Sequence, residues 1–546
     1  MSGYAYLGVD VGSASVRAGI FASTGERLAF VVKPVSQFHG ADQHVEQSSG
    51  EIWQAVCDAV SESVKASAID PALIRAVGFD ATCSLVAVAH DGSGISVSLE
   101  GAAERDIIMW MDHRAQQEAQ TINQTHDDAL RYVGGEVSVE MELPKILWLK
   151  RRFPDRYRRI WRLFDLADYL VWRACGSDVA SVCTLTCKWN YLAHERRFSL
   201  ALLRAVGLED AIDKIPPAVL NLGEKAGRLQ PAIASQWGLG DDVAVAGGII
   251  DAHAGALALS GAQPAGSLAI VSGTSNCHMI VSRRPIEIPG VWGPYWGAML
   301  PEWWLNEGGQ SAAGALVEWT LQQHAYWPAL QQEASAQGAS VFQLLNQWVE
   351  KLEAQERWPT RQLHVLGDHH GNRSPRANPQ ARGAIYGLTL ESGPSGLARL
   401  YLATLQAIAY GTRQIIEAMR AAGHQVSRIM MCGGATKNPL WLREYANATG
   451  CDIHLAREDD AVTLGAALLG SVACGDFATL PQAAAAMSRH GRTVQASRDP
   501  DVQAFHQAKY QVCLMMYQQQ QQARQRFNEI MNPTRQDPPL QENVLC

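Results

Sequence analysis

Apolar runs and turn signals alternate along the first part of the chain. The runs that predict short strands cover residues 4–9, 16–21, 28–32, 75–79 and 85–89. Polar breaks separate them, for example at residues 10–13 and at Thr24-Gly25. Apolar residues then recur at a spacing of four from Ile52 to Val64, directly after a capping-box pattern at residues 48–51. A sheet covered by this helix is therefore expected.

The middle of the chain, from about residue 115 to 240, carries mainly helical patterns. Residues 145–150 predict a helix whose basic ends reach water. We expect this segment to elaborate the first domain. Strands interleaved with helices indicate an α/β fold.

The opening pattern returns after residue 243. Predicted strands at 243–248, 267–271 and 277–281 enclose an acidic break at Asp251, a helix of small residues at 252–259 and a polar turn at 272–275. Two similar halves that face a cleft are the economical explanation of this repeat. We expect an N-terminal domain over residues 1–260 and a C-terminal domain over 261–480.

The end of the second half predicts a strand at 428–432, a Gly433-Gly434-Ala435 turn and a helix at 439–448. Small residues at 461–475 predict a helix that packs closely against its neighbours. Beyond residue 500 the chain is rich in glutamine at 518–522 and in proline at 533–545. Residues 481–546 are expected to form a solvated helix and a loose tail that carry no chemistry.

The composition and charge of the chain exclude several classes of protein. The 546 residues are 47% hydrophobic and 18% charged, which excludes a disordered chain and fits two or three domains. The net charge of −8 disfavours binding to nucleic acid or to an anionic membrane. Eleven scattered cysteines do not form a disulfide framework. Without a signal-peptide pattern or a membrane-spanning apolar run, a cytoplasmic location is expected.

Two turns are candidates for phosphate binding. The chain has neither a P-loop pattern nor a dinucleotide-binding glycine fingerprint after its first strand. Asp10, Gly12 and Ser13 offer a carboxylate, a close backbone approach and a hydroxyl, and the Gly273-Thr274-Ser275 turn offers a second such site. Each turn alone is more often structural. Their occurrence in matching halves favours the functional interpretation.

Eight strings follow one another along the two halves of the chain. They are GFDATCS at 78–84, WMDHR at 110–114, CKW at 187–189, IDAHAG at 250–255, GVWGP at 290–294, NEGGQS at 306–311, HGNRSP at 370–375 and CGGA at 432–435. Through these strings the chain resembles, over residues 4–475, the FGGY carbohydrate kinases, within the superfamily of sugar kinases, heat-shock ATPases and actin, and in particular the pentulose kinases of the D-ribulokinase type.

This resemblance implies two actin-like, ribonuclease H-like domains that close on MgATP and an open-chain ketose. The γ-phosphoryl group would move to the terminal hydroxyl of the sugar, most simply of D-ribulose. Asp251 is similar to the catalytic base of the family, a carboxylate that orients the hydroxyl and accepts its proton. The alternative, that Asp251 merely caps the helix after it, is compatible with catalysis.

The resemblance also assigns the ligands of the nucleotide. Asp10 is similar to the aspartate that holds Mg²⁺ through water, although an Asx-turn carboxylate is the alternative. The residues expected to contact the phosphates are Gly12, Ser13, Gly273, Thr274 and Ser275. The residues expected on the adenine side are Gly309, Gly433, Gly434, Ala435 and Asn438.

The sugar side is predicted from the same strings. Cys83, Lys188, Asp251 and Glu307 resemble substrate contacts of ribulose kinases, and Trp110, Asp112 and His113 belong to the adjacent wall of the first domain. A polyol needs fixed donors, fixed acceptors and an apolar surface. A surface lysine, a core tryptophan and a capping glutamate are the alternatives for each residue alone.

The chain departs from the family pattern in two places. Glu142 stands where a small residue or proline is usual. The second signature has a longer spacer before Ala403, and Arg399 stands where a polar or acidic residue is usual. Zinc is not expected. The candidate sets, Cys183 and Cys187 with His194, and His364, His369 and His370 with Asp368, lack the usual ligand spacing.

Several alternatives stay open. Another pentulose or a pentitol (L-ribulose, D-xylulose, ribitol) is not excluded as substrate, and a catalytically silent sugar or nucleotide sensor could share the fold. The presence of both Asp10 and Asp251 favours an enzyme. An actin-like or chaperone-like ATPase would need a polymerisation surface or a peptide-binding domain. A homodimer is expected as the assembly.

Overall fold

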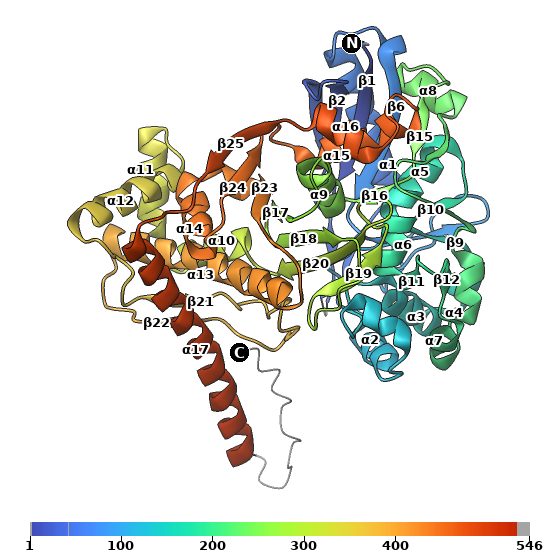
Figure 1. Cartoon of the computed structure of the whole chain (residues 1–546). Helices are drawn as coiled ribbons and strands as arrows, with labels where there is room; N and C mark the ends of the chain where they lie inside the picture. Colours follow the sequence, from blue (N-terminus) through green and yellow to red (C-terminus); the bar gives the residue numbers. More distant parts are fainter. Residues whose placement is uncertain (1–2, 42, 532–546) are drawn as a thin grey trace.

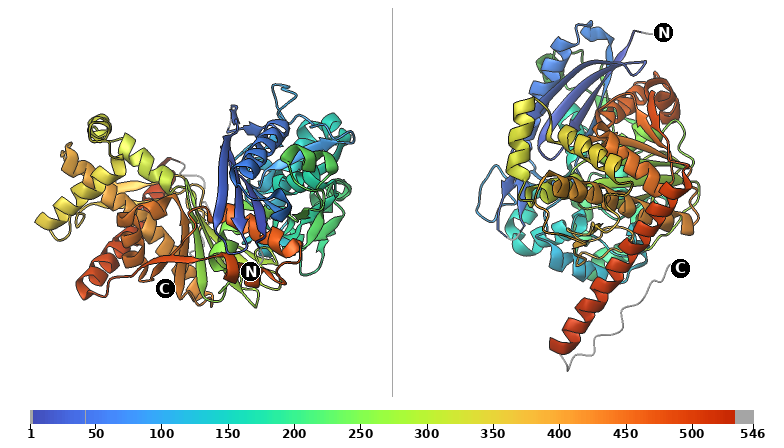
Figure 2. Two further views of the ribbon diagram at one scale, coloured as in Figure 1. Left: turned by 90° about the horizontal axis from the view of Figure 1, so that it is seen from above. Right: turned by 90° about the vertical axis from the view of Figure 1, so that its left-hand side faces the viewer.

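The computed structural model describes residues 3–41 and 43–531. Within that part of the chain, two seven-stranded sheets form the centres of two lobes that lie side by side (Figures 1 and 2). The strand order is β14-β15-β6-β1-β2-β3, with β16 on β6, in the first sheet and β19-β20-β18-β17-β23-β24-β25 in the second.

The first sheet begins as the sequence predicts. Its strands are β1 (Ala5–Val11), β2 (Ser15–Ala22), β3 (Arg27–Pro34), β6 (Ile74–Ala81), β14 (Lys225–Arg228), β15 (Ala244–Ala246) and β16 (Ile249–Ile250). Helix α1 (Ser49–Ala66) lies on β2 and β3 and buries the predicted apolar face. The Ser48 hydroxyl accepts the Glu51 N–H at 3.3 Å, but the Glu51 carboxylate accepts from Ser36 instead of completing a capping box.

A small sheet and a group of helices fill the middle of the chain. The sheet holds β4 (Phe38–His39), β5 (Val45–Gln47), β8 (Ile107–Ile108), β7 (Leu85–Ala89) and β9 (Ile160–Asp165). The helices are α2 (Gln116–Asn123), α3 (Glu142–Arg152), α4 (Pro154–Arg159), α5 (Leu166–Cys175), α6 (Val182–Lys188), α7 (Leu200–Val206) and α8 (Pro231–Trp237).

Helix α3 corrects one expectation. Lys145 does not reach water but is fully buried, with its Nζ 3.2 Å from the equally buried Glu142 carboxylate. The residue that departs from the family pattern therefore neutralises a buried cation on the same helix. Lys150 at the other end behaves as predicted and lies 2.6 Å from Asp210 at the surface.

The second lobe repeats the local topology of the first. Its sheet consists of β17 (Ser267–Ser272), β18 (Asn276–Ser282), β19 (Trp292–Trp296), β20 (Trp304–Gln310), β23 (Arg428–Gly433), β24 (Ile453–Ala456) and β25 (His490–Val494). Strand β17 pairs antiparallel with β18 and parallel with β23, as β1 does with β2 and β6. The predicted repeat of strand, turn and strand is thus confirmed.

Helices of the second lobe share a hydrophobic core with one face of this second sheet. They are α10 (Gly314–Gln322), α11 (Trp327–Gln337), α12 (Val341–Gln355), α13 (Pro394–Ala421) and α14 (Pro439–Thr449). The short strands β21 (His364–Leu366) and β22 (Ala384–Tyr386) pair antiparallel at the two ends of the loop 367–383.

Two helices of small residues join the lobes. Helix α9 (Asp251–Ser260) packs against α15 (Ala461–Ala473), which also lies on β1 and β6 (Figure 1). A Cβ on Gly465 would lie 2.0 Å from the Ala254 carbonyl oxygen, and one on Gly78 would lie 1.9 Å from that of Ala466. Helix α15 therefore packs on the first sheet although it belongs to the second half of the chain. The boundaries at residues 260 and 480 stay a prediction.

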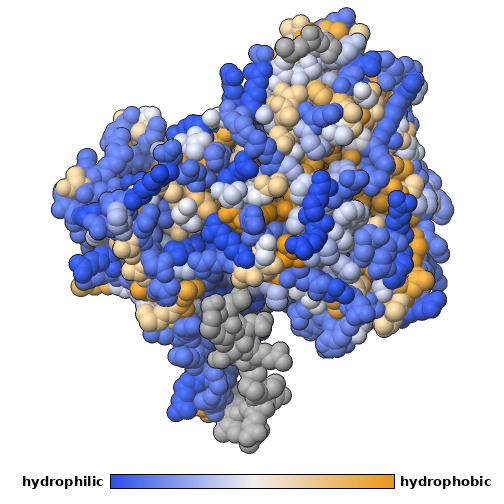
Figure 3. All heavy atoms as spheres, in the orientation of Figure 1, coloured by the Kyte–Doolittle hydropathy of each residue, from blue (hydrophilic) through white to orange (hydrophobic). Residues whose placement is uncertain are grey.

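After α16 (Leu480–Met487), the chain ends its described part in α17 (Pro500–Met531), which projects from the second lobe (Figures 1 and 2). The glutamine-rich segment is helical, as predicted, and the visible part of the projection is largely hydrophilic (Figure 3). The predicted proline-rich tail lies outside the described residues. None of the described helices has the length and apolarity needed to span a bilayer.

Candidate functional site

Three carboxylates meet at the ends of neighbouring strands in the first sheet. Asp10 on β1 stands in register with Asp80 on β6, and Ile249 on β16 stands in register with Asp80 from the other side. Asp251 follows β16 as the first residue of α9. Asp10 is 1% exposed and Asp80 is fully buried. The strand register alone thus gathers these side chains at one edge of the sheet.

The cluster is rich in acidic groups. Arg17 lies 2.8 Å from the carboxylate of Asp10 and 3.8 Å from that of Asp460, the N-cap of α15. Burial and the neighbouring carboxylates raise the pKa of Asp10 to about 7, against the effect of Arg17. Burial likewise raises the pKa of Asp80 and of Asp251. One guanidinium does not compensate this many acidic groups, so the site is suited to a bound cation.

Each of the two predicted phosphate turns is closed by a backbone hydrogen bond, with a span of three residues in the first turn and two in the second. The Gly12 N–H donates to the Ser15 carbonyl at 3.0 Å, and the Gly273 N–H donates to that of Ser275 at 2.9 Å. These two amides therefore close their own turns and are not free donors, contrary to expectation. The Thr274 carbonyl accepts the Ala313 N–H at 2.9 Å, just before α10, which fixes the second turn.

The adenine-side turn lies beside this second phosphate turn. Ser272, the last residue of β17, stands in register with Gly433 at the end of β23. Gly433 has φ of +94°, and a Cβ there would lie 2.1 Å from the Ser272 carbonyl oxygen. A Cβ on Gly434 would meet no atom within 4 Å. Gly434 thus leaves open space, as predicted, next to the buried Ala435.

Two further residues expected on the adenine side have other partners. A Cβ on Gly309 would lie 2.6 Å from an Arg373 nitrogen, so this glycine makes room for Arg373. Asn438 caps α14 by accepting the Leu440 N–H at 3.2 Å, and its amide donates to the Tyr401 hydroxyl at 2.6 Å. The Asn438 side chain therefore uses its oxygen and one of its amide protons within the fold.

The predicted sugar residues form a charged pair beside an indole ring. The Lys188 Nζ at the end of α6 lies 4.0 Å from the Glu307 carboxylate on β20 and 4.3 Å from the centre of the Trp292 ring. Burial lowers the pKa of Lys188, but the nearby acidic groups, Glu307 first, outweigh this effect and raise the pKa above its ordinary value. Burial raises the pKa of Glu307, but Lys188 and the other nearby cations outweigh this effect and lower it. Both groups are thus charged. The Glu307 Oε2 is buried and has no hydrogen-bond partner among the described residues.

Trp110 and Cys83 connect the sugar residues to the first phosphate turn. The indole N–H of Trp110 donates to the Ser13 hydroxyl at 2.9 Å. Cys83 is buried close enough to Lys188 to feel its charge, although burial dominates and raises the pKa of the thiol. Cys83 therefore stays a neutral thiol. The structure brings both residues to the predicted site.

The carboxylate of Asp112, which is predicted in the wall beside the sugar, is occupied by groups of the fold. Asp112 is fully buried, and its carboxylate accepts from the Arg114 guanidinium at 2.7 Å and from the Val45 N–H at 2.6 Å. This network uses the carboxylate to hold the wall in place. His113 lies beside Arg114 and Trp148 in a pocket of about 590 Å³ that none of the other predicted sugar residues lines.

Three residues with a clear place in the site were not predicted. Asp80 stands beside Asp10. The sequence pattern that could have identified Asp80 is a carboxylate directly after the predicted strand at 75–79. The His253 Nε2 lies 3.5 Å from Glu307, two residues after Asp251. Arg373 lies 2.8 Å from Glu140, which links the two halves of the chain. No local pattern distinguishes Arg373 from a surface arginine.

The cysteine and histidine side chains that lie together differ from the two candidate zinc sets in the sequence. The Sγ atoms of Cys183 and Cys187 gather with His253, all within 4.8 Å of one another, and His194 is not part of the group. These three side chains are buried. Within residues 3–41 and 43–531, the second set with His364, His369, His370 and Asp368 forms no such group.

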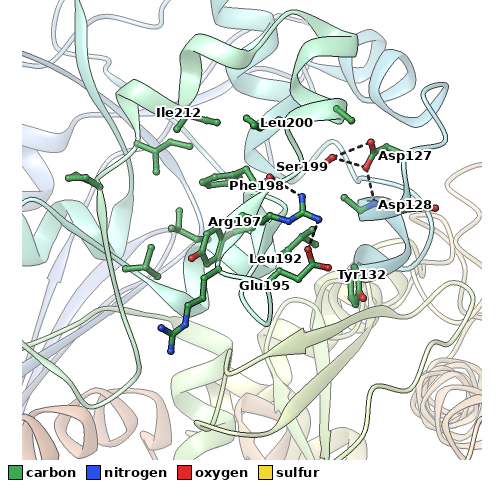
Figure 4. A pocket seen from close by; sticks show the side chains of 18 of the residues that line it. Asp127, Asp128, Tyr132, Leu192, Glu195, Arg197, Phe198, Ser199, Leu200 and Ile212 are labelled. Atoms are coloured by element: carbon green, nitrogen blue, oxygen red, sulfur yellow. Dashed lines mark hydrogen bonds and ion pairs between the residues drawn. The ribbon is translucent and has the colours of Figure 1, made fainter.

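A pocket of about 990 Å³ lies in the first lobe (Figure 4). It is lined by side chains around the β11 (Tyr191–Leu192) and β12 (Arg197–Phe198) hairpin. None of the predicted site residues lines it. The Ser199 hydroxyl in its wall donates to Asp127 at 3.1 Å.

Comparisons with known proteins agree with this geometry. The N-terminal-domain model of the FGGY family of carbohydrate kinases matches residues 5–258, and its C-terminal-domain model matches residues 268–474. A Homo sapiens FGGY carbohydrate kinase domain-containing protein is 43% identical over 539 residues, which cover 95% of this chain and 97% of that protein.

A Saccharomyces cerevisiae D-ribulokinase is 37% identical over 515 residues, covering 86% of this chain and 72% of that protein. A Bacillus licheniformis ribulokinase is 30% identical over 476 residues, covering 83% and 85% of the two chains.

Solved structures support the fold. A xylulose kinase from Rhodospirillum rubrum matches with a TM-score of 0.77 at 20% identity, covering 94% of this chain and 98% of that one. Plasmodium falciparum glycerol kinase with ADP matches with a TM-score of 0.77 at 14% identity and the same coverage. The predicted α/β fold with two actin-like domains is thereby confirmed.

Proposed function

The chain belongs to the FGGY family of carbohydrate kinases, and we propose that it transfers the γ-phosphoryl group of ATP to the terminal hydroxyl of D-ribulose. One observation carries this proposal. Asp251 stands next to the Asp10 and Asp80 carboxylates on one side and within electrostatic reach of Lys188 and Glu307 on the other. A carboxylate between a cation site and a polyol site suits phosphoryl transfer to an alcohol.

The sugar side offers the groups that a ketose needs. Lys188 can donate hydrogen bonds to the sugar, and the Glu307 Oε2, which lacks a hydrogen-bond partner among the described residues, can accept one. The Trp292 ring provides an apolar surface. Because the lysine and glutamate are charged and buried, a hydroxyl that bridges them forms charge-assisted hydrogen bonds. Trp110 and Cys83 complete this proposed wall.

The phosphate side fits Mg²⁺ bound with ATP. Asp80 is fully buried beside Asp10, and carboxylate oxygens are preferred ligands of this hard cation. Asp10 and Asp80 would hold the ion, which when bound neutralises charge on the phosphate oxygens. Ser13, Thr274 and the amides beyond the two turn glycines would then orient the phosphates.

Asp251 is proposed as the general base. Its carboxylate accepts the Ala252 N–H at 2.6 Å, which fixes the side chain at the start of α9. Burial raises its pKa, so the carboxylate accepts a proton more readily than an exposed aspartate. The hydroxyl that it orients would attack in line, with positioning supplying much of the acceleration.

D-Ribulose is chosen because the yeast relative is named a D-ribulokinase. Relatives named ribulokinase and a structural neighbour named xylulose kinase keep the other pentuloses in the comparison. A cytoplasmic location and a homodimer remain predictions.

The test is a coupled assay of ADP release with MgATP and six alcohols: D-ribulose, L-ribulose, D-xylulose, L-xylulose, ribitol and glycerol. A reaction without sugar is the control. We expect the highest kcat/KM with D-ribulose. Preference for another pentulose would overturn the substrate, and the same rate without any sugar would overturn the kinase function.

A further inference from the structure

Three side chains that can bind a metal, and to which the proposed reaction gives no role, meet beside the sugar residues. Cys183 and Cys187 lie one turn apart on α6, and His253 lies on α9. Their ligand atoms lie within 4.8 Å of one another, and all three residues are fully buried. Both cysteines are free thiols. Two thiols and an imidazole are a typical set of zinc ligands.

Glu307 supplies a fourth ligand atom at the right spacing. The His253 Nε2 lies 3.7 Å from the Cys187 Sγ and 3.5 Å from the Glu307 Oε2. In a tetrahedral zinc site, neighbouring sulfur, nitrogen and oxygen ligands lie about 3.3–3.8 Å apart. The Glu307 Oε2 is buried and has no hydrogen-bond partner among the described residues. It can therefore bind an ion without first losing a hydrogen bond.

The protonation states of these groups suit a metal ion. Burial lowers the pKa of His253 to about 4, against the effect of Glu307, so the imidazole is neutral at pH 7 and keeps a lone pair. Burial raises the pKa of the Cys187 thiol, and a neutral thiol is a poor nucleophile, which argues against a reactive cysteine. On binding the ion, the two thiols release their protons to solvent, and the two thiolates balance its charge.

We propose that Cys183, Cys187, His253 and Glu307 bind Zn²⁺, and that the bound ion inhibits phosphorylation by withdrawing Glu307 from the sugar. Soft thiolate ligands select Zn²⁺ over Mg²⁺, so this site is distinct from the one proposed for MgATP. The binding of Zn²⁺ stands on the geometry of the four side chains, whereas the inhibition rests on the proposed function. Because one oxygen of Glu307 serves both ligands, Zn²⁺ and sugar weaken the binding of each other.

The first experiment titrates the reduced, full-length protein with Co²⁺ and follows absorbance. Thiolate-bound Co²⁺ gives a sulfur-to-cobalt charge-transfer band, which Co²⁺ bound only to carboxylates lacks. Cys183→Ala removes one ligand. Cys57→Ala is the matched control, because Cys57 is also a buried free cysteine but lies on α1. We expect a saturable band for the wild type and for Cys57→Ala, removed by added Zn²⁺, and at least about tenfold weaker binding by Cys183→Ala.

Cys187→Ala is the second variant, since it removes the other thiolate, and thermal unfolding shows whether each variant is folded. A wild type without the charge-transfer band would overturn the inference. So would equal Co²⁺ affinity of the wild type and a folded Cys183→Ala or Cys187→Ala.

The second experiment measures inhibition by Zn²⁺ at saturating MgATP. Zn²⁺ should raise the apparent KM for D-ribulose without lowering kcat in the wild type and in Cys57→Ala, and should have a weaker effect in Cys183→Ala. A lower kcat at unchanged KM would overturn competition at Glu307. The charge-transfer band in a protein without any sugar kinase activity would retain the metal site while the proposed function fails.

Discussion

At the scale of single residues, the Glu307 carboxylate is the acceptor with the most to gain from a bound sugar, because its Oε2 is buried without a hydrogen-bond partner. We expect Glu307→Gln to raise the KM for the sugar by about 10- to 100-fold, the range for a lost hydrogen bond to a charged group. Steady-state kinetics with saturating MgATP checks this value. The exposed Glu302→Gln is the control. An unchanged KM in Glu307→Gln would remove this residue from the sugar site.

The strings of the family resemblance located Lys188, Asp251 and Glu307, and the polar turn after the first predicted strand located Asp10. No sequence pattern indicated that Asp112 and Asn438 are engaged within the fold. Their oxygens are occupied by a guanidinium and by backbone amides that only the folded chain brings near. Unpartnered and partnered carboxylates look the same in a sequence.

At the scale of elements, the contact between α15 and α9 depends on the absence of side chains. Gly465→Ala would place a Cβ 2.0 Å from the Ala254 carbonyl oxygen on the helix that carries Asp251. We expect this overpacking to cost about 1–3 kcal/mol of unfolding free energy. Urea unfolding measures it.

The control is Gly50→Ala at the start of α1, where the nearest atom would lie 3.8 Å from the new Cβ. That change should leave stability equal or slightly higher, since alanine has the greater helix propensity. Equal effects of the two substitutions would contradict a tight α15–α9 contact.

Helix α17 should make stability depend on pH. Burial lowers the pKa of Lys509 to about 7, although Glu444 and Cys513 oppose this, and its Nζ donates to the Thr360 carbonyl at 2.9 Å. Between pH 7 and the ordinary lysine pKa, the Lys509 side chain is protonated in the unfolded chain and mostly neutral in the folded protein. Stability therefore rises with pH in this window and falls as pH drops toward 7.

Lys509→Met should remove this dependence, which amounts to about 1 kcal/mol per pH unit for one proton. Urea unfolding at pH 7, 8 and 9 gives the slopes for the wild type, for Lys509→Met and for the exposed control Lys351→Met. If all three slopes coincide, Lys509 is charged in the folded protein.

Short elements were largely predictable because apolar spacing and turn residues determine them locally. The strands around the two turns and the helices at α1, α9, α14 and α15 agree with the sequence pattern within a few residues. Lys145 is the exception, since its partner Glu142 lies on the same helix and both face inward. A basic residue near a helix end is usually solvated, so no local signal marked this buried pair.

At the scale of the whole molecule, the two lobes must approach the same phosphate. The turn at Gly12 belongs to the first sheet and the turn at Gly273 to the second, and Arg373 and Glu140 already join the two halves at 2.8 Å. We expect D-ribulose with a non-hydrolysable ATP analogue to reduce the radius of gyration in small-angle scattering. Each ligand alone is the comparison. The same radius in every state would indicate a rigid molecule.

The repeat of two halves could be predicted from the sequence, since each half carries its own strand, turn and strand. The packing of α15 on the first sheet could not. Helix α15 follows β24 of the second sheet in the chain, and its place on the first sheet depends on close backbone contacts at Gly8, Gly78 and Gly465 that form only in the folded protein.

The central claim is transfer of a phosphoryl group to a pentulose with Asp251 as base. Its most direct test follows the products of D-ribulose and MgATP by ³¹P NMR for the wild type and for Asp251→Asn. The wild type should form D-ribulose 5-phosphate, and Asp251→Asn should form it at least about 100-fold more slowly while still binding the sugar. Equal rates for the two proteins, or no sugar phosphate from the wild type, would contradict the account.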